Sequence, residues 1–278
     1  MKAIENMIFG GERALYESDG IVLKNCRFEG EEDGESALKE SCRVQAFGCF
    51  FDLRYPLWHD RDVQVVVCTM SSTCRAPLWY SSDIKIKSST MHGTKALREC
   101  ENIYIEGTDI VSDELGWDCR GITIESTSAR GEYMLSRATD IYARDFKMQG
   151  KYSFQYIKNA RLENCVLNTK DAFWHAKDVT VVNSVINGEY LGWYSENLTL
   201  ENCIITGTQP LCYCRGLKLI NCEMHECDLA FERSEVEAQI TTPVISIKNV
   251  LSGEITVPCV DEIICDGERY KGKITILK

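Results

Sequence analysis

The residues best suited to chemistry lie around His175, which stands nineteen residues from both Tyr156 and Tyr194. Asp171 and Lys170 precede it by a few residues. A histidine flanked by phenols, near an aspartate and a lysine, suits proton abstraction beside a stabilised carbanion. We therefore predict that these five residues form the catalytic cluster of a polyuronide lyase or a sugar epimerase. A structural role for the histidine in a side-chain ladder is the alternative.

A second candidate cluster combines Glu99 and Asp118, which are also nineteen residues apart. If the chain repeats with this period in neighbouring strands, the two carboxyl groups lie about 5 Å apart, near the separation in retaining glycosidases. Like charges at that distance raise the pKa of one carboxyl group and so provide an acid and a base. The alternative is a surface salt-bridge ladder with Arg98 and Arg137.

Aromatic residues occur at matching positions of the same period. All five tryptophans share one position, and most tyrosines fall within a few residues of it. An exposed aromatic strip with interleaved charges is typical of a binding face, although stacked rings also stabilise a repeat protein that binds nothing. The residues that we predict to bind substrate on this strip are Trp58, Trp79, Trp117, Trp174, Trp193, Arg98, Lys151 and Tyr190.

The nineteen-residue period extends over most of the chain and predicts its fold. Counting from the residue that opens each turn, positions zero, two, five and seven are apolar or small, which indicates short strands with one buried face. Glycine, asparagine or aspartate recurs at position eighteen, where a tight corner requires a left-handed backbone. The opening residues are Lys2, Ile21, Val44, Val63, Ile84, Ile103, Ile122, Ile141, Ala160, Val179, Leu198, Leu217 and Val236.

Three corners and three short strands per turn leave no room for a crossover helix. We predict an all-β, single-stranded parallel β-helix of about 13 coils, stacked about 4.8 Å apart. A hexapeptide repeat is absent, which favours the right-handed form. The expected domain is a β-helix over residues 1–243, with residues 244–278 folding back as a C-terminal cap. Insertions near Glu31–Gly34 and Ser72–Cys74 are expected at corners.

The net charge of −11 argues against a nucleic-acid partner, and no apolar run is long enough for a membrane span. The N-terminal residues show no export signal, so we predict a cytoplasmic protein whose 15 cysteines are reduced. Position five, with its many cysteines, is expected to pack inward. We predict no cofactor and no metal; the one alternative is a zinc site at Cys212, Cys214, His225 and Cys227.

Several segments also resemble a known family. They are DGESALKE, RYPLWH, RAPLWY, GTKALREC, GKYSFQY, TKDAFWHAKD, GEYLGWYSENLT, GTQPLCYC and DLAFE. These strings are similar to an uncharacterised bacterial family of unknown function, and the resemblance covers nearly the whole chain. It implies a pectin-lyase-like right-handed parallel β-helix, and it implies no catalytic residues.

Together these patterns predict a carbohydrate-active or carbohydrate-binding protein. As an enzyme it would be a lyase, hydrolase or epimerase acting on an oligosaccharide or another small polar ligand held by the aromatic strip. The alternative is a noncatalytic protein that uses the strip to bind a ligand or to assemble into a homo-oligomer.

Overall fold

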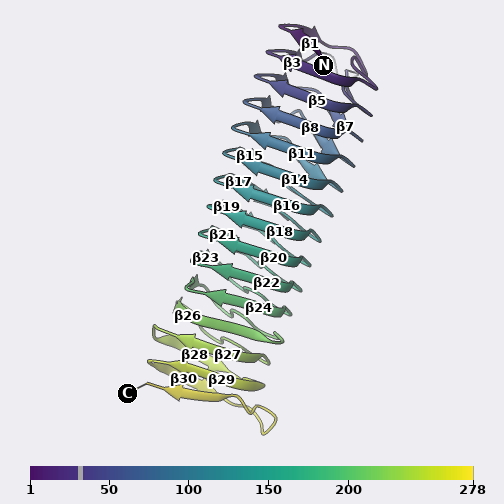
Figure 1. The fold of residues 1–278 in the computed structure, drawn as a ribbon. Helices are drawn as coiled ribbons and strands as arrows, with labels where there is room; N and C mark the ends of the chain where they lie inside the picture. Colours follow the sequence, from purple (N-terminus) through teal and green to yellow (C-terminus); the bar gives the residue numbers. More distant parts are fainter. Residues whose placement is uncertain (31–33, 278) are drawn as a thin grey trace. The chain divides into compact units, whose positions relative to one another are not determined.

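The computed structural model describes residues 1–30 and 34–277. The chain is a parallel β-solenoid of about 14 turns, spaced about 19 residues apart, and no described residue lies in a helix (Figure 1). The predicted fold class is therefore confirmed. The chain divides into two compact units, Met1–Asp140 and Ile141–Lys278, which are described in turn.

Each turn of the first unit opens with a strand, continues with a shorter one and, in three turns, adds a third. The opening strands are β1 (Lys2–Glu5), β3 (Asp19–Lys24), β5 (Cys42–Phe47), β8 (Arg61–Val66), β11 (Ser82–Lys87), β14 (Glu101–Glu106) and β16 (Arg120–Glu125). The second strands are β2 (Ile8–Phe9), β4 (Arg27–Phe28), β6 (Phe50–Phe51), β9 (Thr69–Met70), β12 (Thr90–Met91), β15 (Asp109–Val111) and β17 (Ser128–Glu132). The third strands are β7 (Leu57–Trp58), β10 (Leu78–Trp79) and β13 (Leu97–Arg98).

The strands of this unit pair in parallel in the predicted register. Ile21 pairs with Val44, which pairs with Val63, and Val63 pairs with Ile84 across the insertion near Ser72–Cys74. The opening side chains from Ile21 onward are buried, which confirms the predicted inward face, whereas Lys2 in the first turn is exposed. The other predicted insertion includes residues 31–33, which lie outside the described residues.

Strand β18 (Thr139–Arg144) lies at the division between the units. The second unit then repeats the pattern of strands. Its opening strands are β20 (Lys158–Glu163), β22 (Lys177–Val182), β24 (Glu196–Glu201), β26 (Leu217–His225), β27 (Glu235–Ile240), β29 (Ser252–Val257) and β31 (Lys273–Ile276). The other strands are β19 (Lys147–Lys151), β21 (Val166–Lys170), β23 (Val185–Asn187), β25 (Ile204–Thr206), β28 (Val244–Lys248) and β30 (Val260–Ile264).

The C-terminal strands add turns to the solenoid, and they do not fold back. Strand β29 pairs in parallel with β27, and β31 pairs in parallel with β29. The sequence period dissolves here because one turn is shorter, so that Val236 pairs with Gly253. Our expectation that residues 244–278 fold back is therefore wrong. Their role in covering the end of the solenoid stays a prediction.

The cysteine-rich position five packs inward as predicted, and the hydrogen bonds explain its composition. The amide of Cys68 donates to Ser89 Oγ in the next turn at 3.1 Å, and Ser89 Oγ donates to the carbonyl of Lys87 at 2.8 Å. The preceding residue, Ser88, has a left-handed backbone that turns the chain at this corner. In most turns the position therefore holds a small side chain with a γ atom that forms hydrogen bonds, which serine, threonine and cysteine provide; Phe146 is an exception.

A second inward position of this kind, position sixteen, was not predicted. The amide of Ser41 donates to Asp60 Oδ1 at 3.0 Å, and the amide of Asp60 donates to Ser81 Oγ at 3.0 Å. Serine and cysteine dominate this position, and Asp60 is its one carboxylate in the described chain. Asp60 is 1% exposed, and burial raises its pKa to about 8.

The predicted corner at position eighteen is confirmed, since Asp62, Asp83, Asn102, Asp178 and Asn197 all have positive φ. Asparagines at position four form a side-chain ladder in the second unit. Asn202 Nδ2 donates to Asn183 Oδ1, and Asn221 Nδ2 donates to Asn202 Oδ1. In residues 1–30 and 34–277, no helix is long and apolar enough to cross a bilayer.

Candidate functional site

The strongest candidate site is a column of four stacked rings in the second unit, which we call the ring column: Tyr156, His175, Tyr194 and Tyr213. Neighbouring ring centroids lie 4.9, 4.9 and 4.8 Å apart, and the interplanar angles are 6°, 7° and 11°. Tyr156 is 51% exposed and Tyr194 is 43% exposed. One ring per turn thus reaches solvent from the same position of the repeat.

This stacking decides which part of each ring a ligand can meet. The faces of His175 and Tyr194 are covered by the rings above and below them. A sugar ring therefore cannot stack on these interior faces, which is the contact that the sequence pattern first suggests for exposed aromatics. The exposed parts are the ring edges, which carry phenolic hydroxyls and imidazole nitrogens.

An unusual backbone positions the ring column. In the turn that contains His175, the residues Asp171, Phe173 and His175 all have positive φ, between 53° and 59°. Each non-glycine residue in this conformation costs roughly 1–2 kcal/mol. Alternate left-handed residues turn Phe173 fully inward and leave His175 exposed. Concentrated backbone strain of this kind is a feature of functional sites, and here it recurs from turn to turn.

The tryptophans beside the ring column hold the next turn in place. The indoles of Trp174 and Trp193 stack at 5.3 Å with an interplanar angle of 3°. Trp174 Nε1 donates to the carbonyl of Tyr190 at 2.7 Å, and Trp193 Nε1 donates to the carbonyl of Gln209 at 2.7 Å. Tyr190 in turn packs edge-on against Trp193 at 5.4 Å. Both indoles are only partly exposed, so their chief contacts are within the protein.

We expect Trp174→Phe to destabilise the protein by about 1–2 kcal/mol, because the carbonyl of Tyr190 loses its donor. Trp58→Phe is the matched control, since Trp58 Nε1 has no partner in the described chain and no hydrogen bond is lost. Denaturant unfolding of both variants measures the difference. Equal losses in the two variants would show that the indole hydrogen bond is not what stabilises this corner.

The charged residues predicted to accompany His175 do not converge on its ring. Lys170 Nζ lies 2.8 Å from Glu189 Oε2, and that contact raises the pKa of the lysine. Asp171 is 5% exposed, and burial raises its pKa. Lys151 pairs with Lys170 in the strand register and is exposed. In the part of the chain that the structure describes, no residue forms a hydrogen bond with the imidazole of His175.

In the first unit the predicted binding residues form a column of aromatic and cationic side chains. Trp58 and Trp79 stack at 5.8 Å, and Lys39 Nζ lies 4.4 Å from the Trp58 ring. The Arg98 guanidinium lies between Trp79 and Trp117, at 5.6 and 5.4 Å from their centroids. Cation–π contacts of this kind stabilise by about 0.5–2 kcal/mol each. The ligand-binding role of Arg98, Trp58, Trp79 and Trp117 stays a prediction.

Glu99 and Asp118 each have a partner of their own. Asp118 forms a bidentate ion pair with Arg137. Oδ1 lies 2.7 Å from Nε, and Oδ2 lies 2.6 Å from Nη2. Glu99 Oε1 accepts from Trp79 Nε1 at 3.4 Å and lies 3.6 Å from Arg98 Nε. These contacts correspond to the alternative of a salt-bridge ladder with Arg98 and Arg137. An acid–base role for the two carboxylates stays a prediction.

The four residues considered for zinc do not form a common site. Cys212, Cys214 and Cys227 are buried and donate to backbone carbonyls, and burial raises their pKa values to about 11–12. His225 is exposed and lies 2.9 Å from Glu223. Among the described residues, no group of three or more histidine, cysteine, aspartate or glutamate side chains is placed to hold a metal.

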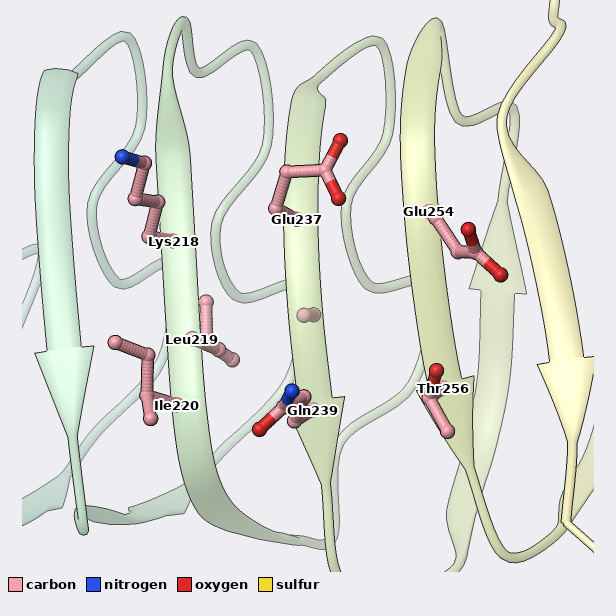
Figure 2. Close-up of a pocket in the computed structure, with 8 residues that line it drawn as sticks. Lys218, Leu219, Ile220, Glu237, Gln239, Glu254 and Thr256 are labelled. Atoms are coloured by element: carbon pink, nitrogen blue, oxygen red, sulfur yellow. The ribbon is translucent and has the colours of Figure 1, made fainter.

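A hollow that the sequence did not indicate lies on the outer face of strands β26, β27 and β29 (Figure 2). It has a volume of about 260 Å³ and mixed charge. Lys218, Glu237 and Glu254 form one row of its lining in strand register, and Gln239 pairs with Thr256. Ile220 also lines the hollow, where the pairing of β26 with β27 is irregular. Glu254 is bonded to Lys273 and Thr275. Outward residues of regular strands show no distinctive pattern, so sequence alone does not reveal such a hollow.

Comparison with known proteins identifies a family but no activity. Residues 2–277 match the family described as "Protein of unknown function (DUF3737)". No curated protein sequence matches the chain.

Several solved structures are similar at low identity. The surface adhesin PfbA of Streptococcus pneumoniae is 11% identical over 79% of this chain and 72% of its own, with a TM-score of 0.46. The mannuronan C-5 epimerase A-module of Azotobacter vinelandii is 10% identical over 85% of this chain and 88% of its own, with a TM-score of 0.42. A GH87 α-1,3-glucanase catalytic domain is 10% identical over 100% of this chain and 64% of its own, with a TM-score of 0.36. Similarity this low carries no inference about function.

Proposed function

The chain belongs to the DUF3737 family, whose description assigns no activity, and we propose from the geometry of the ring column that it binds a linear oligosaccharide. The ligand lies along Tyr156, His175, Tyr194 and Tyr213, parallel to the direction in which the turns stack. The phenolic hydroxyls and the imidazole nitrogens form hydrogen bonds with its hydroxyl groups.

One observation carries this proposal. Four exposed or partly exposed rings, one per turn, have centroids 4.8–4.9 Å apart and turn their polar edges outward. A row of hydrogen-bonding groups at regular spacing is complementary to a polymer that repeats polar groups along its length. Since the rings are already ordered by stacking, binding costs little side-chain entropy.

Binding is better supported than catalysis at this column. General acid–base catalysis is most efficient when burial or neighbouring groups position the acid or base and tune its pKa. His175 has stacked phenols as neighbours at 4.9 Å, which is a ring contact. Lys170 is engaged by Glu189, and the carboxyl group of Asp171 is buried. The catalytic roles predicted for these residues stay predictions.

The test begins with a thermal-shift screen of linear oligosaccharides, both neutral and acidic, followed by calorimetry on any that stabilise the protein. We expect Tyr194→Phe to keep the ring stack and the melting temperature but to weaken binding about 3- to 10-fold, through the loss of one hydrogen bond. Tyr104→Phe, outside the ring column, is the matched control and leaves the affinity unchanged. Affinity that is identical in wild type and Tyr194→Phe would contradict binding through ring edges.

Two further outcomes would replace the proposal. Cleavage or epimerisation of the bound oligosaccharide that is lost in His175→Ala would establish an enzyme. A homo-oligomer at micromolar concentration that Tyr194→Ala dissociates would establish self-assembly through the ring column. We expect the oligosaccharide to be recovered unchanged and the assembly state to be independent of Tyr194.

A further inference from the structure

A separate hollow of about 300 Å³ lies in the first unit, beside the C-terminal ends of strands β12, β15 and β17. Its lining residues come from four successive turns, beginning with that of Ser72. The next three turns place His92, Val111 and Arg130 at the same position of the repeat. The side chain of Val111 is shorter than those of His92 and Arg130 on either side, and this leaves a gap in the row of side chains, which we call the notch. The volume is at the lower end of the range for small-molecule sites.

The polar groups around the notch have unused hydrogen-bonding capacity. Within the described ranges, the guanidinium of Arg130 forms no ion pair or hydrogen bond, although the hydrogen bond with His92 and, to a smaller extent, the charge of Arg130 lower the pKa of the nearby Asp109. The hydroxyls of Ser72 and Thr94 have no protein partner there. Asp113 Oδ1 accepts the amide of Glu132 at 2.8 Å, which leaves Oδ2 for a ligand.

The imidazole of His92 is held by a hydrogen-bonded neighbour. Its Nε2 lies 3.0 Å from Asp109 Oδ2, while Asp109 Oδ1 accepts from Ser128 Oγ at 2.8 Å. These bonds fix the ring at one side of the hollow and leave Nδ1 available. Orientation of this kind by a bonded carboxylate is typical of histidines that contact a ligand.

Opposite charges face the hollow without pairing with each other. Arg130 requires an anionic partner, and a carboxylate suits its guanidinium best because both are planar and can form two hydrogen bonds. Asp113 requires a donor and opposes a simple anion. A ligand that satisfies both therefore combines a carboxylate with hydroxyl groups.

We propose that the hollow lined by Ser72, His92, Thr94, Asp113 and Arg130 binds a small hydroxycarboxylate, such as a sugar acid. The carboxylate binds Arg130 and the hydroxyl groups bind Asp113, Ser72 and Thr94. The site is independent of the ring column, so it can be correct when the oligosaccharide proposal fails.

Calorimetry with gluconate, acetate and glycerol tests the proposal. Gluconate carries both kinds of group, acetate only the carboxylate and glycerol only hydroxyls, so we expect gluconate to bind at least tenfold more tightly than either. Arg130→Met, at an exposed side chain, should weaken gluconate binding at least tenfold without changing the melting temperature. Val111→Phe should also weaken gluconate binding at least tenfold, because the larger side chain fills the notch. Arg120→Met, which removes another exposed arginine paired with Asp140, is the control.

The ligand could be a free sugar acid or the acidic end of a sugar chain. The affinity of the protein for gluconate is therefore compared with its affinity for an oligosaccharide that ends in the same group. Tighter binding of the oligosaccharide would assign the site to a chain end, and tighter binding of gluconate to a free acid. The proposal is overturned if gluconate produces no heat at millimolar concentrations, if acetate binds equally well, or if Arg130→Met and Val111→Phe both retain wild-type affinity.

Discussion

Replacing Asp60 by serine is expected to stabilise the protein by several kcal/mol at pH 8 and to have little effect near pH 4. Asp60 is 1% exposed, and its Oδ2 has no partner in the described chain. Burial is the main cause that raises its pKa from 3.8 to about 8. The folded protein therefore holds this proton more tightly than the unfolded chain, and stability is lost as the pH rises from about 4 to about 8.

The size of the effect follows from the pKa difference. A shift of about 4 units at about 1.36 kcal/mol each sets an upper value on the order of 5 kcal/mol. Serine already occupies the same position of neighbouring turns at Ser41 and Ser81, where its hydroxyl both accepts and donates. Substituting it for Asp60 keeps an acceptor for the amide of Ser41 and removes the carboxylate.

Unfolding free energies of wild type and Asp60→Ser at pH 5, 6.5 and 8 measure this difference. Asp62→Asn, at an exposed carboxylate two residues away, is the control and should show no matching pH dependence. A stability difference between Asp60→Ser and wild type that stays constant from pH 5 to pH 8 would show that Asp60 does not carry the expected ionisation.

Gly188→Ala is expected to destabilise the protein by about 3 kcal/mol, because the corner that leads into the ring column has no room for the added methyl group. A Cβ atom at this residue would lie 2.1 Å from the carbonyl oxygen of Thr169 in the preceding turn. Its φ of 151° is also unfavourable for alanine. Neither the backbone of Thr169 nor that of Lys170 can move without breaking the strand pairing of β21 with the adjacent turns.

Gly267→Ala provides the control, because a Cβ atom there meets nothing within 4 Å. Thermal unfolding of both variants, with circular dichroism to check the fold, gives the comparison. Similar melting temperatures for the two variants would mean that the turns at Gly188 are less closely packed than the structure indicates.

The sequence predicted the fold because the features that define it are periodic. Apolar residues at the opening positions, and aspartate or asparagine at position eighteen, repeat every turn and match the register of pairs such as Val63 with Ile84. Position sixteen was missed because its residues, which include serine, cysteine, alanine, Asp60 and Ile157, do not belong to one hydropathy class. Most of them have a small side chain with a hydrogen-bonding γ atom, and this property becomes apparent only when the backbone donors are known.

The candidate site was predicted in part. Spacing alone placed Tyr156, His175 and Tyr194 in one column, and the structure brings their rings together. It did not reveal that stacking covers the ring faces, or that Phe173 adopts a left-handed backbone, since aromatic residues rarely do. The indole hydrogen bond of Trp174 to the next turn was also beyond the pattern, because it depends on the course of the backbone at Tyr190.

The most direct test of oligosaccharide binding along the ring column is the dependence of affinity on ligand length. Calorimetry with a series of increasing length, built on the oligosaccharide that the screen identifies, should show affinity rising with each added unit until the chain spans from Tyr156 to Tyr213. In Tyr156→Phe the rise should end about one unit earlier. Affinity that stops rising at a single sugar unit, or a length dependence that is unchanged by Tyr156→Phe, would contradict binding along the ring column.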